Sequence, residues 1–229
     1  MKSLDSVGWF GKLPSLGDFA SRRLSSHFIE HWDAWLSSGL AAWQASAPDH
    51  WLDHYLGGPS WRFVAMASTL PGPCASTAWA GVLVPSVDRV GRYFPLTLAQ
   101  PLAQLPLDTA QANALLGWLH RLDDLAVDAL HDDWNIDQLE AALAREGAAP
   151  PQTADADSTL ACALPGLANP TLHTRLQGYV LWITANAEPG PPRLRLDRGL
   201  PTGEDFNTLI CGAPVDVTHS LQHALTHSP

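Results

Sequence analysis

The chain has 229 residues, a formal net charge of −10, an apolar share of 46% and ten tryptophans. This length and apolar share are sufficient for a globular core, whereas the acidic balance argues against binding to nucleic acids or anionic membranes through a basic face. The three cysteines are widely spaced and odd in number, which argues against a disulfide framework and predicts reduced thiols.

The N-terminal part of the sequence predicts a strand followed by two helices. Residues 7–12 alternate aromatic side chains with glycines and are closed by a Leu-Pro pair, as expected for a short strand. From Ser25, apolar side chains recur at steps of three and four residues and form one broad stripe, and Ser25 or Ser26 can cap the start of this helix. The stripe consists of Phe28, Trp32, Trp35, Leu36, Leu40 and Trp43. A shorter helix is expected at residues 49–56, before Gly57 and Gly58.

Three strand-like runs follow, at residues 61–67, 78–84 and 92–99. The links between them are short and rich in turn-forming residues, whereas a parallel crossover needs about a dozen residues or more. We therefore expect a three-stranded antiparallel meander, with one face covered by the long N-terminal helix.

The second half of the chain predicts mainly helices. Amphipathic patterns predict helices at residues 109–130, 135–145 and 202–211, and an apolar run predicts a late strand at residues 179–184. The segment 148–159 is rich in proline, alanine, aspartate and threonine, so we expect it to be a loop or weakly ordered.

These elements indicate an α+β fold, in which helices pack on a mostly antiparallel sheet. The sheet combines the three-stranded meander with the N-terminal and late strands, in a single domain that spans residues 1–229. No apolar run approaches the roughly 20 residues that a membrane helix needs, and the first residues lack the basic-then-apolar pattern of a secretory signal. We therefore expect a cytoplasmic protein without membrane insertion and without a nucleic-acid partner.

The most informative stretch is PSVDRVGRYFPL, residues 85–96. It places Asp88, Arg89 and Arg92 between segments that should be buried, and these residue types are rarely buried unless they are paired. The stretch therefore predicts either an internal ion-pair network or a site where another molecule docks. Arg89 and Arg92 lie three residues apart and could also form a fork that binds a carboxylate or a phosphate.

Two further stretches have the same character. They are GWFGKLPSLGDF at residues 8–19, which contains Asp18, and PSWRF at residues 59–63, which contains Arg62. Because side chains alternate along a strand, Arg62 should point away from the face that carries Trp61 and Phe63. The candidate site consists of Asp18, Arg62, Asp88, Arg89 and Arg92. These residues either neutralise one another inside the fold or form a surface that docks a partner. A catalytic role is a third possibility, although the set lacks a nucleophile, a metal cage and a positioned histidine.

Together, the three stretches resemble the TagF/ImpM family of type VI secretion-associated proteins, which carries a GK-L-P-x-x-GDF opening, a P-x-WRF segment and a PSVDRVGRYFPL-type segment. The resemblance is strong in the N-terminal part of the chain and weaker beyond it. It implies a cytoplasmic accessory protein that represses the secretion system after translation by binding its forkhead-associated scaffold protein, alongside the threonine phosphorylation pathway. The chain would be the stand-alone form, without the phosphatase domain to which some members are fused. Neither these three stretches nor the resemblance indicates an enzyme or a cofactor.

Two alternatives stay open. His27, Glu30 and His31 match the H-x-x-E-H pattern, in which two histidines one helical turn apart hold a metal and the glutamate acts as a base. This pattern would make the protein a metal-dependent hydrolase. Related spacings recur at His50 and His54, and at His219, His223 and His227. The other alternative is a small-molecule sensor, with an aromatic pocket between the sheet and the loop at residues 85–95.

Overall fold

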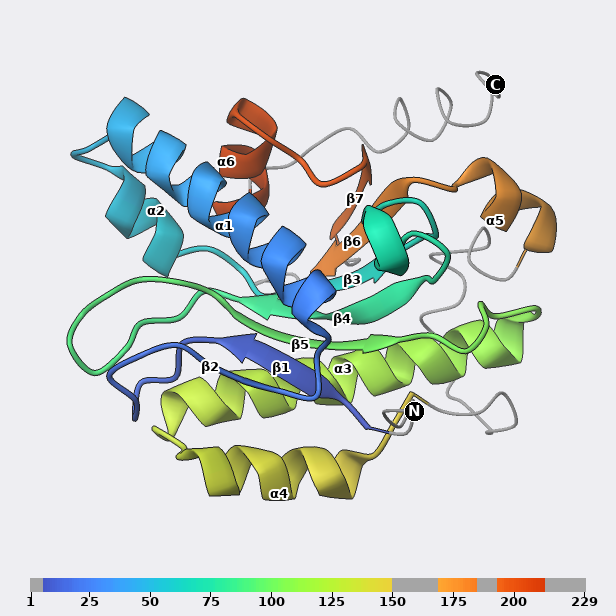
Figure 1. Cartoon of the computed structure of the whole chain (residues 1–229), viewed down its shortest axis with the longest axis horizontal. Helices are drawn as coiled ribbons and strands as arrows, with labels where there is room; N and C mark the ends of the chain where they lie inside the picture. Colours follow the sequence, from blue (N-terminus) through green and yellow to red (C-terminus); the bar gives the residue numbers. More distant parts are fainter. Residues whose placement is uncertain (1–5, 150–168, 185–192, 213–229) are drawn as a thin grey trace.

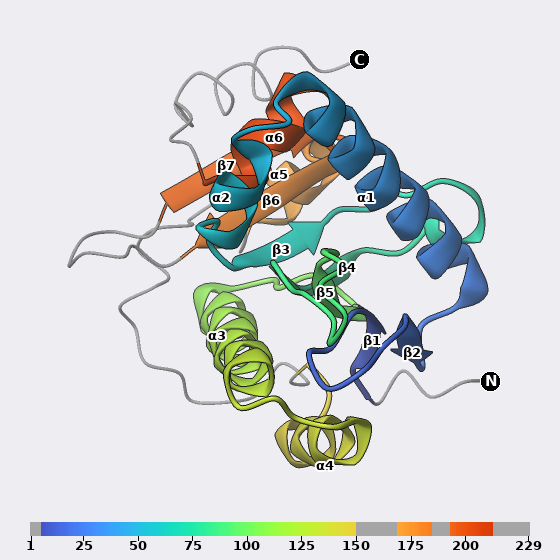
Figure 2. The same cartoon turned by 90° about the vertical axis from the view of Figure 1, so that its left-hand side faces the viewer.

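The computed structural model describes residues 6–149, 169–184 and 193–212. In these residues a seven-stranded antiparallel sheet lies between two layers of helices, as Figures 1 and 2 show. The strands are β1 (Gly8–Gly11), β2 (Ala20–Arg22), β3 (Trp61–Ala65), β4 (Trp79–Val84), β5 (Leu96–Pro101), β6 (Tyr179–Thr184) and β7 (Arg193–Arg198). The helices are α1 (Ser26–Ser46), α2 (Trp51–Leu56), α3 (Thr109–His131), α4 (Ile136–Glu146), α5 (Pro170–Arg175) and α6 (Glu204–Ile210), with a short 3-10 helix η1 (Gly72–Cys74). The predicted α+β class is confirmed.

The sheet has the strand order β2-β1-β5-β4-β3-β6-β7, and every neighbouring pair is antiparallel. Its centre is the predicted meander of β3, β4 and β5. The N-terminal strand β1 pairs with β5, and the late strand β6 pairs with β3. Because β1 and β5 are antiparallel, the loop that leaves β1 lies beside the loop that enters β5.

The helices divide between the two faces of the sheet. The layer of α1, α2 and α6 covers one face, and α3 with α4 covers the other (Figure 2). The hydroxyl of Ser25, one of the two predicted caps, accepts a hydrogen bond from the Phe28 N–H and caps α1. Side chains of Asp108 and Asn135 cap α3 and α4 in the same way, so each long helix begins at a residue that satisfies one of its free N–H groups.

Each face of the sheet has its own apolar core. Along β3, Trp61 and Phe63 belong to the core under α1, whereas Val64 belongs to the core under α3. Eight of the ten tryptophans are buried, so most of these side chains stabilise the fold and are not available to a partner. The alternation along β3 directs Arg62 towards α3, away from Trp61 and Phe63.

Several elements differ from the sequence prediction. The patterns do not predict β2, α5 or β7, and the first two have only three and six residues, which is too short for periodicity to reveal. The third strand of the meander begins at Leu96 and not at residue 92, because Val87 pairs with Tyr93 in a separate hairpin within the loop.

Two predictions lie wholly or mostly outside the described residues. They are the loop at 148–159, of which only residues 148 and 149 are described, and the three C-terminal histidines. No helix in the described ranges combines the length and apolarity that crossing a membrane requires.

Candidate functional site

Two of the three motif stretches meet at one end of the sheet. The loop after β1 (residues 12–19) and the loop between β4 and β5 (residues 85–95) are joined by hydrogen bonds, and we call this pair of loops the loop junction. The Arg89 N–H donates to the Leu16 carbonyl at 2.9 Å, and the Ser86 hydroxyl donates to the Lys12 carbonyl at 2.8 Å. The loop junction is therefore ordered by contacts between segments that lie far apart in the sequence.

The carboxylate of Asp88 is the centre of the loop junction, and it is fully buried. Its Oδ2 accepts hydrogen bonds from Lys12 Nζ at 2.5 Å and from Arg92 Nε at 2.8 Å. Its Oδ1 accepts from the backbone N–H groups of Val90 at 3.0 Å and Arg92 at 2.9 Å. Burial opposes ionisation, but these four donors outweigh it and hold the pKa of Asp88 well below its usual range.

Aromatic side chains support the same end of the molecule. Phe19 stacks on Phe10 with ring centroids 5.8 Å apart and meets Phe94 edge-on at 4.8 Å. The Lys12 ammonium lies 4.4 Å from the centroid of the Phe19 ring, a distance at which cation and ring attract each other. Tyr55 of α2 donates its hydroxyl hydrogen to the Ser86 carbonyl at 2.9 Å, and burial raises the pKa of this tyrosine.

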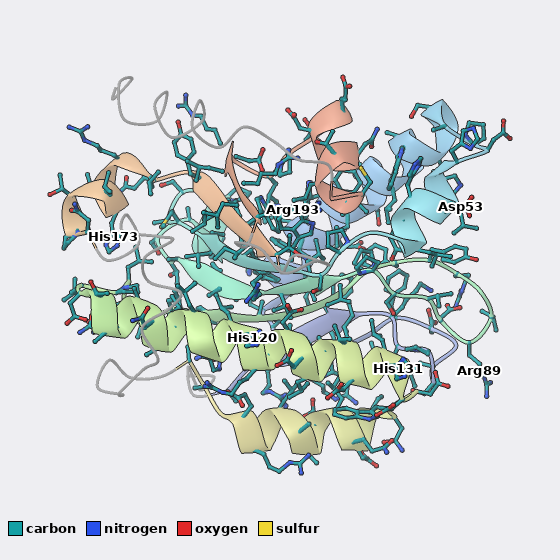
Figure 3. All side chains as sticks on the ribbon, turned by 180° about the vertical axis from the view of Figure 1, so that it is seen from behind. Asp53, Arg89, His120, His131, His173 and Arg193 are labelled. Atoms are coloured by element: carbon teal, nitrogen blue, oxygen red, sulfur yellow. The ribbon has the colours of Figure 1, made fainter. Side chains whose placement is uncertain are left out.

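The outer residues of the loop junction are arranged differently. Arg92 is half-exposed, and its guanidinium also donates to the Gly17 carbonyl and lies 3.9 Å from the exposed Asp18 carboxylate. Because Arg92 is bound to Asp88 and Gly17, it is not available as one half of a fork with Arg89. Figure 3 shows Arg89 at the outer end of its loop, pointing away from the sheet. In the described part of the chain, the Arg89 guanidinium has no hydrogen-bond or ion-pair partner.

The fifth candidate, Arg62, lies apart from the other four. It is buried between β3 and α3, where its Nε is 3.6 Å from Oδ2 of Asp123. Arg62 Nε and Asp123 Oδ1 have no hydrogen-bond partner among the described residues. Burial raises the pKa of Asp123, although a hydrogen bond from Ser60 and the charge of Arg62 oppose that rise. The pair is therefore incompletely satisfied and weakly stabilising.

We predict that Arg62→Met lowers the free energy of unfolding by about 1–3 kcal/mol, because it leaves a buried carboxyl group without its cation. The double variant Arg62→Met/Asp123→Leu should recover most of that loss, since replacing an entire buried ion pair by apolar side chains is often neutral or stabilising. Chemical denaturation of the two variants and of Asp123→Leu gives the coupling energy. A double variant that is less stable than either single variant would show that the pair stabilises the fold.

Among the described residues, the histidines and the glutamate of the hydrolase alternative do not converge on a metal site. In the ranges that the structure describes, no three histidine, cysteine or acidic side chains lie close enough to hold a metal ion, and these ranges include His27, Glu30 and His31. A cavity of about 350 Å³ lies at the start of α1, and its lining includes Arg23, His27 and Cys74. A shallower one of about 290 Å³ lies between α3 and α4. Neither is lined by the 85–95 loop, where the sensor alternative placed its pocket.

The sequence interpretation missed the groups that complete these networks. Lys12 lies within a quoted motif, but lysine is almost never buried unless it is paired, and its partner is 76 residues away. Asp123 is four residues after Leu119 and three before Ala126, both buried in α3. A carboxylate on this apolar stripe was the signal that could have identified the partner of Arg62.

Glu140 of α4 was also missed. It accepts hydrogen bonds from the side chains of Trp9 and Arg23. Burial raises the pKa of Glu140, but these hydrogen bonds outweigh burial and hold the pKa below its usual range.

Comparisons with known proteins identify a family and a similar solved structure. The model of the TagF N-terminal domain, described as type VI secretion system-associated, matches residues 8–145. Among solved structures, the crystal structure of PA0076 from Pseudomonas aeruginosa PAO1 superposes with a TM-score of 0.72 and 31% sequence identity, over 92% of this chain and 96% of that chain. No curated protein gives a significant match. The region matched by the family model contains the whole loop junction together with Arg62 and Asp123.

Proposed function

Because the chain belongs to the TagF family of type VI secretion system-associated proteins, we propose that it is a cytoplasmic repressor of that secretion system. It acts after translation by binding the forkhead-associated scaffold protein of the system, and it occupies a surface that assembly requires. It works through protein contacts, without a catalytic step and without a cofactor.

The observation that carries this proposal is the construction of the loop junction. Two of the family's three motif stretches are used to fix the positions of two surface loops around the buried Asp88. Loops held on a rigid scaffold are where proteins commonly place their binding residues. The junction also presents an arginine and an aromatic side chain to solvent, and these residue types contribute strongly to binding energy at protein interfaces.

The proposal is tested in the host bacterium and with purified proteins. Deleting the gene should increase the amount of type VI substrate in the culture medium, and overproducing the protein should decrease it. The purified chain should bind the purified scaffold protein in a calorimetric titration, with one binding site per chain. Secretion that is unchanged in both strains, or a titration without heat of binding, would contradict the proposal.

A further inference from the structure

The end of the loop junction that faces solvent combines apolar and cationic side chains. Among the described residues, five large apolar side chains are exposed: Phe19, Leu56, Val90, Leu107 and Val127. Two of these five belong to the loop junction, where Phe19 is 45% and Val90 is 63% exposed. Val90 directly follows the exposed Arg89. We call Phe19, Arg89 and Val90 the junction tip.

The backbone holds the junction tip in a defined conformation. Between Asp88 and Arg92 the chain reverses through two backbone hydrogen bonds, from the Asp88 N–H to the Arg92 carbonyl and from the Gly91 N–H to the Asp88 carbonyl, both 3.0 Å long. The Asp88 carboxylate binds two further N–H groups of the same turn. A side chain presented by such a turn loses little backbone entropy when it binds a partner.

The charge of the junction tip differs from that of the whole chain. The two loops carry three cations (Lys12, Arg89 and Arg92) and two carboxylates (Asp18 and Asp88), a local balance of +1 in a chain with a net charge of −10. Asp88 binds both Lys12 and Arg92, and the Asp18 carboxylate lies 3.9 Å from Arg92. These two carboxylates offset two of the three cations, and the cation without a partner among the described residues is Arg89. An exposed arginine without an internal partner, next to the exposed Val90, matches an acidic group on another molecule.

We infer that the junction tip is the docking surface for the protein partner, and that the partner presents a carboxylate beside an apolar side chain. This inference rests on the proposed function and specifies the surface and the chemistry of recognition. The carboxylate pairs with the Arg89 guanidinium, and the apolar side chain packs on the neighbouring Val90. A single free arginine favours a carboxylate over a phosphate, because phosphorylated motifs are bound by clusters of arginines and Arg92 is held by Asp88.

The test measures the Kd of the full chain for the purified scaffold protein by calorimetry. Arg89→Glu and Val90→Asp should each weaken binding about tenfold or more, as expected for residues at the centre of an interface. The matched control is Arg198→Glu, because Arg198 is also an exposed arginine without an ion pair among the described residues but lies on the edge strand β7. The control should bind with the Kd of the unaltered chain. The melting temperatures of all three variants should equal that of the unaltered chain. The reason is that the side chains of Arg89, Val90 and Arg198 make no hydrogen bond within the described fold.

Each outcome decides a different question. Weaker binding by the two tip variants with normal binding by Arg198→Glu supports the inference. If the unaltered chain binds the scaffold protein and the tip variants bind equally well, the docking surface lies elsewhere and only the proposed function stands. Equal weakening by Arg198→Glu would show a general charge effect and would overturn the inference. If the unaltered chain does not bind, the proposed function and the inference both fall.

Treating the scaffold protein with a phosphatase should leave the Kd unchanged, and loss of binding after this treatment would overturn the carboxylate assignment.

Discussion

Replacing Gly11 by alanine is expected to destabilise the protein by roughly 2–6 kcal/mol, the sum of backbone strain and steric overlap. Gly11 ends β1 with φ +136°, in a region of backbone conformation that favours glycine. A Cβ atom at this position would lie 2.1 Å from the Pro95 carbonyl oxygen, where the two loops of the junction come together. The contact is with backbone, so no side-chain rotation relieves it. Urea denaturation monitored by tryptophan fluorescence measures the loss.

Gly17→Ala is the matched control, because it alters another glycine of the same motif. A Cβ atom at Gly17 would meet no atom within 4 Å, so we expect a change within about 0.5 kcal/mol, as for an ordinary surface substitution. If the two alanine variants were equally stable, the close approach of β1 to Pro95 would not be the reason for glycine at position 11.

Replacing Asp88 by asparagine is expected to lower the melting temperature by roughly 6–20 °C, because it leaves a buried ammonium group without its counterion. Lys12 is 3% exposed, and its ammonium has no other acceptor in the described part of the chain. Differential scanning calorimetry at pH 7 gives the shift. Asp18→Asn serves as the control, since the Asp18 carboxylate is exposed and lies 3.9 Å from Arg92; its melting temperature should stay close to that of the unaltered protein.

The effect of Asp88 should also depend on pH in a defined direction. Its pKa is lower in the folded state than in the unfolded chain, where an aspartate titrates near 3.9. The ionised carboxylate therefore stabilises the fold above that value, and this contribution is lost progressively as the pH falls below about 4. The difference in unfolding free energy between the unaltered protein and Asp88→Asn should be constant above about pH 5 and should narrow at lower pH. A difference that widened on acidification would contradict the network described here.

The fold class could be predicted from the sequence because local patterns specify the long elements. The apolar stripe of α1, the serine that caps α1 and the short links of the meander each act within a few residues, and the structure contains all three. β7 was missed although residues 193–197 alternate polar and apolar side chains, the pattern that predicts a half-buried strand. What this pattern does not reveal is that the polar side of the strand is covered as well, since Arg195 is buried and paired with Asp197.

The candidate site was predicted only as a set of residues, because its pairings depend on tertiary contacts. Sequence reasoning placed Asp18, Asp88 and three arginines in one group, but Arg62 lies on β3 and pairs with Asp123 of α3. Arg89 and Arg92 are three residues apart, yet one points to solvent and the other binds Asp88. Which arginine faces inward is decided by the hairpin between Val87 and Tyr93, and no spacing rule specifies that hairpin.

The strand order also has a consequence for the synthesis of the protein. The region that the family model matches ends at residue 145, but the sheet is completed along the outer edge of β3 by β6 and then β7. Until β6, β7 and α6 leave the ribosome, the nascent chain presents the backbone N–H and C=O groups of β3 together with Trp61 and Phe63. The contact of Phe63 with Trp182 of β6 and the hydrogen bond from Trp61 to Leu209 of α6 cannot yet form. Open strand edges beside apolar side chains are sites of aggregation. Residues 179–210, which are made after the region that the family model matches, are thus the part that protects this region from associating with other nascent chains.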